Sequence, residues 1–483
     1  MSIAGAIDLG TTRIKAAVLR DDGSLETVAD LPAPAITGPG LRRESDPAAY
    51  REAATAALDA LRSRAGTEPA IGLASQRSSF VLWDAGSGAP VTPLISWQDR
   101  RAAAWCEARR RDEPWVARLT GLRLSPHYAG PKLAVLRESS PELAAGLGDG
   151  TLRFGTLESF LLWGWTGGTC HETDPTMAAR TLLFDIGAGD WSAALLELFG
   201  VPPACLPRIV PTLGRGTAMA GGGRLEVGIA DQAASALAVL GTGPAGTTVT
   251  LGTGGFVLRP TGRGPTDHGP TDHGPTDHGP TGHRPTGHRP RARPGYLAGP
   301  LLATSRATWF AVEGTINGAA AAVDRYGPGP TRLPRRDPAP EAFCLPDAAG
   351  VGAPHWIPGR GMAFSPAARR LGTENRRRVV LEGVVFRVRE ILEGLGDAGG
   401  RLHLAGGLAR DPFVAPALAA CLGREVHRLE EAETTLLGAA RLAAGLTDRG
   451  SIPATACRPG AAGGYLAPKF ARWSSWLRTE LGG

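Results

Sequence analysis

Hydrophobic and polar positions at the start of the chain follow a pattern that predicts strands joined by a tight turn. Residues 3–9 and 14–19 are mostly apolar, and the turn-forming run Gly10-Thr11-Thr12 separates them. Asp46-Pro47 predicts a helix start, because Asp caps free N–H groups and Pro fits the first helical turn. We therefore expect a strand meander followed by a helix, and then a further strand at residues 71–75.

The second half of the chain shows a similar arrangement about 240 residues after the first. Residues 247–258 favour a strand, a glycine-rich turn and a resumed strand. Apolar residues then recur at helical spacing at 381–392, and a further helix is predicted at about 434–444. The recurrence predicts a duplicated α/β fold, with an N-terminal domain at residues 1–243 and a C-terminal domain at residues 244–483.

A proline-rich repeat interrupts the second half. The pentapeptide Gly264-Pro265-Thr266-Asp267-His268 is followed by two more copies and then by two degenerate copies. Proline every five residues blocks both helices and sheet ladders, so we expect a disordered insert at about 264–294, on a loop tip far from the chemistry. The five histidines of this segment give a weaker alternative interpretation as a metal-binding tract.

Composition and charge exclude several classes of protein. The chain has 483 residues, and 52 basic residues against 46 acidic ones give a net charge of +6. This excess is small for the length and forms no dense basic stripe, which argues against a nucleic-acid surface. No run approaches the ~18 apolar residues of a membrane span, and we expect no leader peptide. The six cysteines form no CxxC pair, so we expect neither a zinc site nor disulfides, in a cytoplasmic protein.

The first glycine turn carries residues suited to nucleotide chemistry. Gly10 lets the backbone approach phosphate oxygens, and the N–H groups and hydroxyls of Thr11 and Thr12 can cradle an anion. Asp8 stands at the end of the preceding strand, where it can hold Mg2+ directly or through water. Lys15 can neutralise phosphate charge. An ordinary hairpin with a solvated aspartate is the competing interpretation.

Two further segments strengthen the case for a nucleotide site. Gly252 and Thr253 belong to a second Gly/Thr turn, and two such turns on facing hairpins can grip a polyphosphate. Neither turn matches a P-loop or a dinucleotide fingerprint. Asp231 lies between a predicted strand and a helix-like alanine run, where a carboxylate can take the proton of an acceptor hydroxyl during phosphoryl transfer. From local sequence alone, a helix N-cap is the simpler interpretation of this aspartate.

Many short segments in a fixed order carry a family resemblance. They run from about residue 6 to residue 445 and comprise 8–15, 75–78, 96–101, 128–133, 155–158, 173–181, 231–232, 252–254, 313–314, 352–356, 382–383 and 406–411. In this order they resemble the FGGY carbohydrate kinases, and within that family they resemble the glycerol kinases most. No single segment is decisive, but so many in register are very specific.

The resemblance implies two actin-like ATPase domains with a ribonuclease-H-like core, and it places ATP and the substrate in the cleft between them. It makes Asp231 the general base and puts Asp8 and Asp231 near Mg2+. The implied ATP contacts are Gly10, Thr11, Thr12, Lys15, Gly252, Thr253, Gly314, Gly407 and Asp411. The implied acceptor contacts are Arg77, Ser78, Trp97, His127, Asp231 and Gln232. A homodimer or a homotetramer is compatible with the resemblance.

The chain departs from the glycerol-kinase pattern at several positions. Ser78 stands where that group usually has a Glu, His127 where it has a Tyr, and residues 176–180 read Thr-Met-Ala-Ala-Arg instead of Thr-Asn-Ala-Ser-Arg. Losing a carboxylate partner weakens the binding of a hydroxyl by about 1–3 kcal/mol if the remaining groups go unpaired. At the nucleotide end, Asp411 replaces the usual Asn and Ala405 the usual acid.

We therefore expect an ATP-dependent phosphotransferase that acts on a hydroxyl of a small polyol or sugar, with glycerol as the leading acceptor. A ketopentose such as xylulose, gluconate or another short polyol is the alternative. A more remote alternative, from a different class, is a non-catalytic actin-like protein that binds partners under nucleotide control. The implied cofactors are ATP and Mg2+, and the implied partner is a small molecule rather than a nucleic acid or a membrane.

Overall fold

The computed structural model describes most of the chain outside the proline-rich repeat. The described residues are 4–66, 68–243, 246–252, 254–264, 293–327, 331–396, 399–447 and 452–482. The expected insert at 264–294 therefore lies almost wholly outside the described residues, and its predicted disorder stays a prediction. Within these ranges, no helix combines the length and the apolar character that crossing a membrane requires.

The first half of the chain is organised around a six-stranded sheet with the order β13-β14-β5-β1-β2-β3. Its strands are β1 (Ala4–Leu9), β2 (Arg13–Leu19), β3 (Leu25–Pro32), β5 (Ala70–Ser75), β13 (Leu213–Ala218) and β14 (Arg224–Ala230). The three central strands β14, β5 and β1 are parallel. Helix α1 (Pro47–Ala65) contacts this sheet, and the carboxylate of Asp46 caps it by accepting from the N–H groups of Ala48 and Ala49. The predicted meander and helix start are confirmed.

A smaller subdomain of short strands and helices accompanies this sheet. Its four-stranded sheet has the order β4-β7-β6-β8. The strands are β4 (Glu44–Ser45), β6 (Phe80–Asp84), β7 (Leu94–Ile95), β8 (Leu152–Thr156), β9 (Glu172–Thr173), β10 (Phe184–Asp185), β11 (Asp190–Trp191) and β12 (Arg208–Ile209). The helices are α2 (Ala103–Ala108), α3 (Glu113–Thr120), α4 (Ala129–Ser139), α5 (Pro141–Asp149), α6 (Leu157–Trp165), α7 (Pro175–Ala178) and α8 (Ala193–Phe199).

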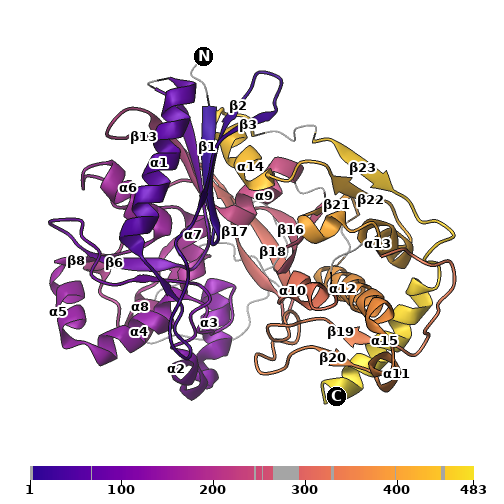
Figure 1. Cartoon of the computed structure of the whole chain (residues 1–483). Coiled ribbons are helices and arrows are strands. Elements are labelled where there is room, and N and C mark those ends of the chain that lie inside the picture. Colours follow the sequence, from indigo (N-terminus) through magenta and orange to yellow (C-terminus); the bar gives the residue numbers. More distant parts are fainter. Residues whose placement is uncertain are drawn as a thin grey trace.

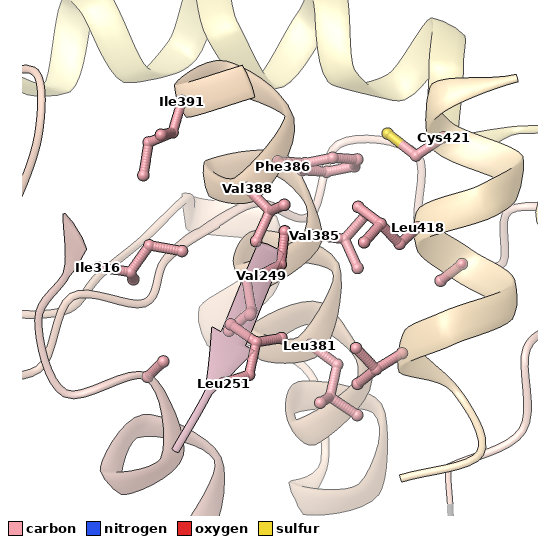
Figure 2. Close-up of a cluster of buried hydrophobic side chains, with 14 of the residues drawn as sticks. Val249, Leu251, Ile316, Leu381, Val385, Phe386, Val388, Ile391, Leu418 and Cys421 are labelled. Carbon is pink, nitrogen blue, oxygen red and sulfur yellow. The ribbon is translucent and has the colours of Figure 1, made fainter. Parts of the chain in front are cut away.

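The second half is organised around a seven-stranded sheet with the order β17-β18-β16-β15-β21-β22-β23. Its strands are β15 (Thr247–Leu251), β16 (Gly255–Gly264), β17 (Leu297–Ala303), β18 (Thr308–Ile316), β21 (Leu402–Ala405), β22 (Val426–Leu429) and β23 (Ala454–Cys457). The remaining elements are α10 (Ala319–Asp324), β19 (Cys344–Leu345), β20 (Ala363–Phe364), α11 (Pro366–Arg369), α12 (Thr373–Leu395), α13 (Val414–Leu422) and α15 (Leu466–Glu480). Figure 2 shows β15 packed on α12, with Val249 and Leu251 facing Leu381 and Val385.

The two sheets share the same strand pairing around their glycine turns. In each, a hairpin closes on a glycine turn, as β1 with β2 and as β15 with β16. The first strand of each hairpin then pairs in parallel with a later strand, β5 in one case and β21 in the other. This correspondence confirms the predicted duplication. The proposed boundary between residues 243 and 244 falls between the two sheets, and its position stays a prediction.

Two helices join the halves at the centre of the molecule, α9 (Asp231–Leu240) and α14 (Thr434–Ala443) (Figure 1). They pack on each other, and α14 also contacts β1 and β5 of the first sheet. Two glycines permit the approach. A Cβ atom on Gly438 would lie 2.0 Å from the carbonyl oxygen of Ala234, and one on Gly72 would lie 2.2 Å from that of Ala439. Both glycines face backbone atoms, which cannot give way as a flexible side chain can.

This packing predicts the effect of a single methyl group. The substitution Gly72→Ala forces β5 and α14 apart, and overpacking of this kind costs about 1–3 kcal/mol. The control is Gly148→Ala, because Gly148 is exposed near the end of α5 with nothing within 4 Å of its Cβ position. Urea unfolding followed by circular dichroism should show a lower midpoint for Gly72→Ala alone. Equal midpoints for the two variants would contradict the packing argument.

Candidate active site

Three side chains converge at the carboxyl edge of the first sheet. Asp8 stands near the end of β1, Arg77 follows β5, and Asp231 follows β14. Because β1, β5 and β14 are parallel neighbours, their carboxyl ends meet at one edge. The guanidinium Nε of Arg77 lies 3.7 Å from Oδ1 of Asp231. The structure thus brings together the two acids that the sequence singled out, with an arginine between their strands.

Asp8 has the surroundings of a cation ligand. Burial raises its pKa to about 8, and the charges of Asp231 and Glu433 add to the shift while Lys15 opposes it. Its Oδ1 is buried and has no hydrogen-bond partner among the described residues. A buried carboxylate oxygen without a donor is satisfied by a hard cation. The residues present therefore fit a divalent ion held between carboxylates.

No closed metal cage surrounds this oxygen. The part of the chain that the structure describes holds no group of three or more His, Cys, Asp or Glu side chains arranged to bind an ion. Mg2+ usually keeps several waters and binds through one or two carboxylates together with substrate phosphates. The open arrangement therefore suits an ion that arrives with a phosphate ligand.

Lys15 is paired with a residue from the other half of the chain. Its ammonium forms an ion pair with Glu433, which directly precedes α14. The residues around Glu433 carry no signal for this contact, because 418 residues separate Glu433 from Lys15. The pair places Lys15 beside the acids at the junction of the halves, and its predicted contact with phosphate stays a prediction.

Asp231 opens α9 but does not cap it. The N-cap position belongs to Ala230, and the carboxylate of Asp231 accepts from the N–H of its neighbour Gln232, at 2.7 Å. The N-cap interpretation was therefore wrong. Burial raises the pKa of Asp231, while the charge of Arg77 and the N–H of Gln232 oppose the rise. A half-buried carboxylate held beside a cation is a suitable proton acceptor near neutral pH.

A carboxylate from the second sheet clasps two arginines of the first half. Glu313, on β18, accepts from Arg77 at 2.8 Å and from Arg180 at 2.7 Å. Burial acts to raise its pKa, but Arg180 and Arg77 outweigh it and hold that pKa at about 2. The ring of Phe256 adds a further contact, with its centroid 5.6 Å from the guanidinium carbon of Arg77. We call Glu313, Arg77 and Arg180 the interdomain clasp.

Two aromatic rings lie side by side near the first glycine turn. The indole of Trp97 donates to the hydroxyl of Thr11 at 3.0 Å, and its ring centroid lies 5.5 Å from that of His127. Burial, followed by the charge of Lys132, holds the pKa of His127 well below its usual range, so the ring is neutral. Lys132 is itself buried and donates to the carbonyls of Ser96 and His127, at 2.8 and 3.0 Å. Lys132 therefore holds the backbone next to Trp97 and the backbone of His127 in place.

Ser78 and Gln232 complete the group predicted to meet the acceptor. Ser78 is fully buried, has a positive φ of 68°, and donates its hydroxyl to the carbonyl of Arg180 at 3.0 Å. It therefore presents no exposed surface, and its predicted acceptor contact stays a prediction. Gln232 is half-buried beside Asp231.

The second glycine turn faces a neighbouring loop across parallel strands. Thr250 of β15 pairs with Ala405 of β21, so Gly252 and Gly406 follow neighbouring strand ends. A Cβ on Gly406, where φ is 95°, would lie 2.4 Å from the carbonyl oxygen of Leu251, so only glycine permits this approach. The sequence assigned no separate role to Gly406. Thr253 lies outside the described residues.

The other three residues predicted to contact the nucleotide differ in their surroundings. Gly407 is exposed next to the second glycine turn. Asp411 forms an ion pair with Arg377 at 2.9 Å, and Gly314 is buried against α12, where a Cβ would lie 2.4 Å from Ile391. Packing alone explains the glycine at 314. The roles of all three residues toward a nucleotide stay predictions.

Comparisons with known proteins agree with this architecture. Residues 3–231 match the model of the N-terminal domain of the FGGY family of carbohydrate kinases, and residues 247–446 match the model of its C-terminal domain. A glycerol kinase from Thermus brockianus is 33% identical over 93% of this chain and 91% of its own length. A glycerol kinase from Trichlorobacter lovleyi is 34% identical, over 92% of this chain and 90% of its own.

Solved structures show the same fold. The structure of a xyloylose kinase from Brucella ovis superposes with a TM-score of 0.80 at 23% identity, covering 99% of both chains. That of Plasmodium falciparum glycerol kinase with ADP gives 0.78 at 18% identity, covering 99% of this chain and 98% of the other. The predicted fold of two actin-like ATPase domains is confirmed. The chain belongs to the FGGY family of carbohydrate kinases, and this membership implies a sugar or polyol substrate, ATP and a divalent metal ion.

Proposed function

We propose that this kinase transfers the γ-phosphoryl group of ATP to a hydroxyl of a small polyol, with glycerol as the leading acceptor. The observation that carries the proposal is the meeting of Asp8, Arg77 and Asp231 at one sheet edge. Phosphoryl transfer needs a proton acceptor, a metal-directed acid and groups that orient the nucleophile. The glycerol kinases that match over nine-tenths of the chain support the choice of acceptor.

Each side chain has a distinct part in the proposed reaction. Asp231 accepts the proton of the attacking hydroxyl, and Arg77 holds that hydroxyl and the base in place. Asp8 and Asp231 would hold Mg2+, which would neutralise charge on the transferring phosphoryl group. The phosphates lie against the two glycine turns and Lys15, and Gly314, Gly407 and Asp411 lie toward the rest of the nucleotide. Trp97, His127 and Gln232 line the acceptor.

A second acceptor class is supported by Ser78. The side chain is buried and bonded to the Arg180 carbonyl, so it offers the acceptor neither a carboxylate nor an exposed hydroxyl. A ketopentose, or a sugar acid such as gluconate, has additional groups that can bind elsewhere in the site. The fold of the Brucella ovis xyloylose kinase superposes on this chain at a TM-score of 0.80. That of a gluconate kinase from Lactobacillus acidophilus superposes at 0.79.

An acceptor panel tests the proposed function. In the presence of ATP and Mg2+, the rate of ADP release should rise strongly when glycerol is added. It should rise less with xylulose, gluconate, erythritol or ribitol, because the similar curated proteins are glycerol kinases. A coupled ADP assay measures the rates, and mass spectrometry identifies the phosphorylated product. A larger rate with gluconate or xylulose would replace glycerol as the acceptor. ADP release that ignores every acceptor would favour a nucleotide-controlled binding protein instead.

Removing the proposed base should stop turnover without preventing nucleotide binding. Asp231→Asn keeps the size of the side chain but cannot take a proton, so kcat should fall by about 10²–10⁴. Isothermal titration should show ATP binding within a few-fold of the wild type. The matched control is Asp59→Asn, because Asp59 is exposed on α1 and pairs with Arg62 on the same helix. Near-wild-type turnover in Asp231→Asn would refute the assignment.

The interdomain clasp predicts a pH-dependent stability. The pKa of Glu313 is about 2 in the folded protein and 4.5 in the unfolded chain, so its ion pairs stabilise the fold above pH 4.5 and lose that effect as the pH falls toward 2. Glu313→Gln should lower the free energy of unfolding at pH 7 by about 3–5 kcal/mol, since it removes the carboxylate that pairs with Arg180 and leaves Arg77 with Asp231 at 3.7 Å. This difference from the wild type should shrink below pH 4.5.

Urea unfolding at pH 7 and at pH 3.5 measures the difference. The control is Glu26→Gln, because Glu26 also pairs with two arginines, Arg20 and Arg64, but at the surface. That variant should change little at either pH. A difference for Glu313→Gln that stays constant across the two pH values would show that the clasp does not act through its charge.

A further inference from the structure

A buried aspartate outside the group described above connects the two halves of the chain. Asp174 is 1% exposed and directly precedes α7. Its carboxylate accepts from three donors: the Thr176 hydroxyl, which lies 2.8 and 2.9 Å from its two oxygens, the Thr212 hydroxyl at 2.6 Å and the Met177 N–H at 3.0 Å. Both threonines are also buried. Each hydroxyl must therefore point its hydrogen at Asp174, which leaves its lone pairs free to accept from other groups.

The first hydroxyl leads to the proposed base. Thr176 accepts from the backbone N–H of Ala230 at 2.8 Å. Ala230 is the N-cap of α9 and its side chain makes no capping bond, so the entry into this helix is fixed from outside it. Asp231 is the next residue. The position of the proposed base therefore depends on a hydroxyl whose direction Asp174 sets.

The second hydroxyl leads to the second sheet. Thr212 accepts from the N–H of Ala303 at 3.0 Å, and its own N–H donates to the carbonyl of Ala303 at 2.8 Å. Ala303 ends β17, which lies at the edge of the seven-stranded sheet. This pair of bonds attaches β17 to the first half of the chain. Asp174 thus accepts from Thr212, which binds β17 at the domain contact, and from Thr176, which binds the residue before the proposed base.

We propose that Asp174 is a positioning residue that couples the seating of β17 on the first domain to the placement of Asp231. When Ala303 is bound to Thr212, the Thr212 hydroxyl is directed at one oxygen of Asp174, and the Thr176 hydroxyl remains directed to hold Ala230. When β17 is displaced, the Thr212 hydroxyl loses the Ala303 N–H that orients it and can turn away from Oδ2 of Asp174. The Thr176 hydroxyl, which already lies 2.9 Å from the same oxygen, then shifts toward it and away from Ala230. The inference rests on the proposed function, since it takes Asp231 as the base.

A simple helix cap does not account for these bonds. An N-cap aspartate needs only the N–H of Met177, which Asp174 also binds. The two threonine hydroxyls are additional, and each bridges to a backbone N–H far along the chain, 54 residues from Thr176 and 91 residues from Thr212. A cap alone would leave the base unaffected by a change at Thr212.

The test removes the hydroxyl at the domain contact and reads the effect at the base. Thr212→Val keeps the shape of the side chain but neither accepts from Ala303 nor donates to Asp174. With glycerol as the acceptor, kcat should fall by about ten- to a hundredfold, the loss expected from a small misplacement of a reacting group. The KM values for ATP and glycerol should stay within about twofold, because no residue that touches either substrate has changed. Thr212→Ser restores the hydroxyl and should restore kcat.

Hydrogen exchange gives a readout that needs no turnover. In Thr212→Val the Ala230 N–H should exchange at least tenfold faster than in the wild type, although its own partner Thr176 is intact. Exchange measured by mass spectrometry on peptides that span residues 228–233 reports this amide. The control is Thr92→Val, because Thr92 also accepts a backbone N–H, from Leu82, in the small sheet of the first half. That variant should leave kcat and exchange at Ala230 unchanged.

The outcomes separate this inference from the proposed function. A wild-type protein without acceptor-dependent ADP release refutes the kinase assignment, and hydrogen exchange then still tests the coupling. Unchanged exchange at Ala230 in Thr212→Val, or a kcat that Thr212→Ser does not restore, overturns the coupling. An equal loss of kcat in Thr92→Val overturns it as well. If Thr212→Val does not fold, Thr176→Val tests the other branch by the same two readouts, and wild-type values there refute the positioning role.

Discussion

The geometry of the site depends on one constraint, the parallel alignment of β1, β5 and β14. Like charges repel, and two half-buried aspartates would not lie close together without backbone that holds them there. The hydrogen-bonded register supplies that backbone, because it fixes the carboxyl ends of the three strands at one edge. Arg77, which follows the middle strand, then offsets part of the negative charge. Burial, followed by the charges of Asp231 and Glu433, still raises the pKa of Asp8.

The second half of the chain completes this edge with charged groups rather than apolar ones. Glu433 pairs with Lys15, and Glu313 pairs with Arg77 and Arg180. Each pair joins a residue near the proposed chemistry to a residue of the other half of the chain. Breaking such a buried pair leaves an uncompensated charge, so the two halves are held in a defined relation where the substrates would bind. By contrast, the contact of α14 with α9 and β5 is made by small residues packed on backbone.

The sequence predicted those features that depend on neighbouring residues. The glycine turns, the helix start at Asp46 and the strand at 247–251 follow from turn chemistry, capping and alternation, which act over a few residues. Glu313 and Glu433 carried no such signal, because their partners are 236 and 418 residues away. Asp231 shows the same limit in another form. Its local sequence favoured a cap, and only the register of β14 shows that Ala230 occupies that position and that Asp231 faces Arg77.

Only three of the 52 basic residues are lysines, Lys15, Lys132 and Lys469, which gives the folded chain an unusual chemical surface. Lys132 and Lys469 are fully buried, each donating to carbonyl or carboxylate oxygens, and Lys15 is largely covered by its pair with Glu433. The exposed positive charge is therefore carried by guanidinium groups, which do not react with acylating reagents. The amines of Lys132 and Lys469 become accessible to such reagents only when the protein opens. Acylation at either lysine would thus report opening of the fold around it, with no engineered label.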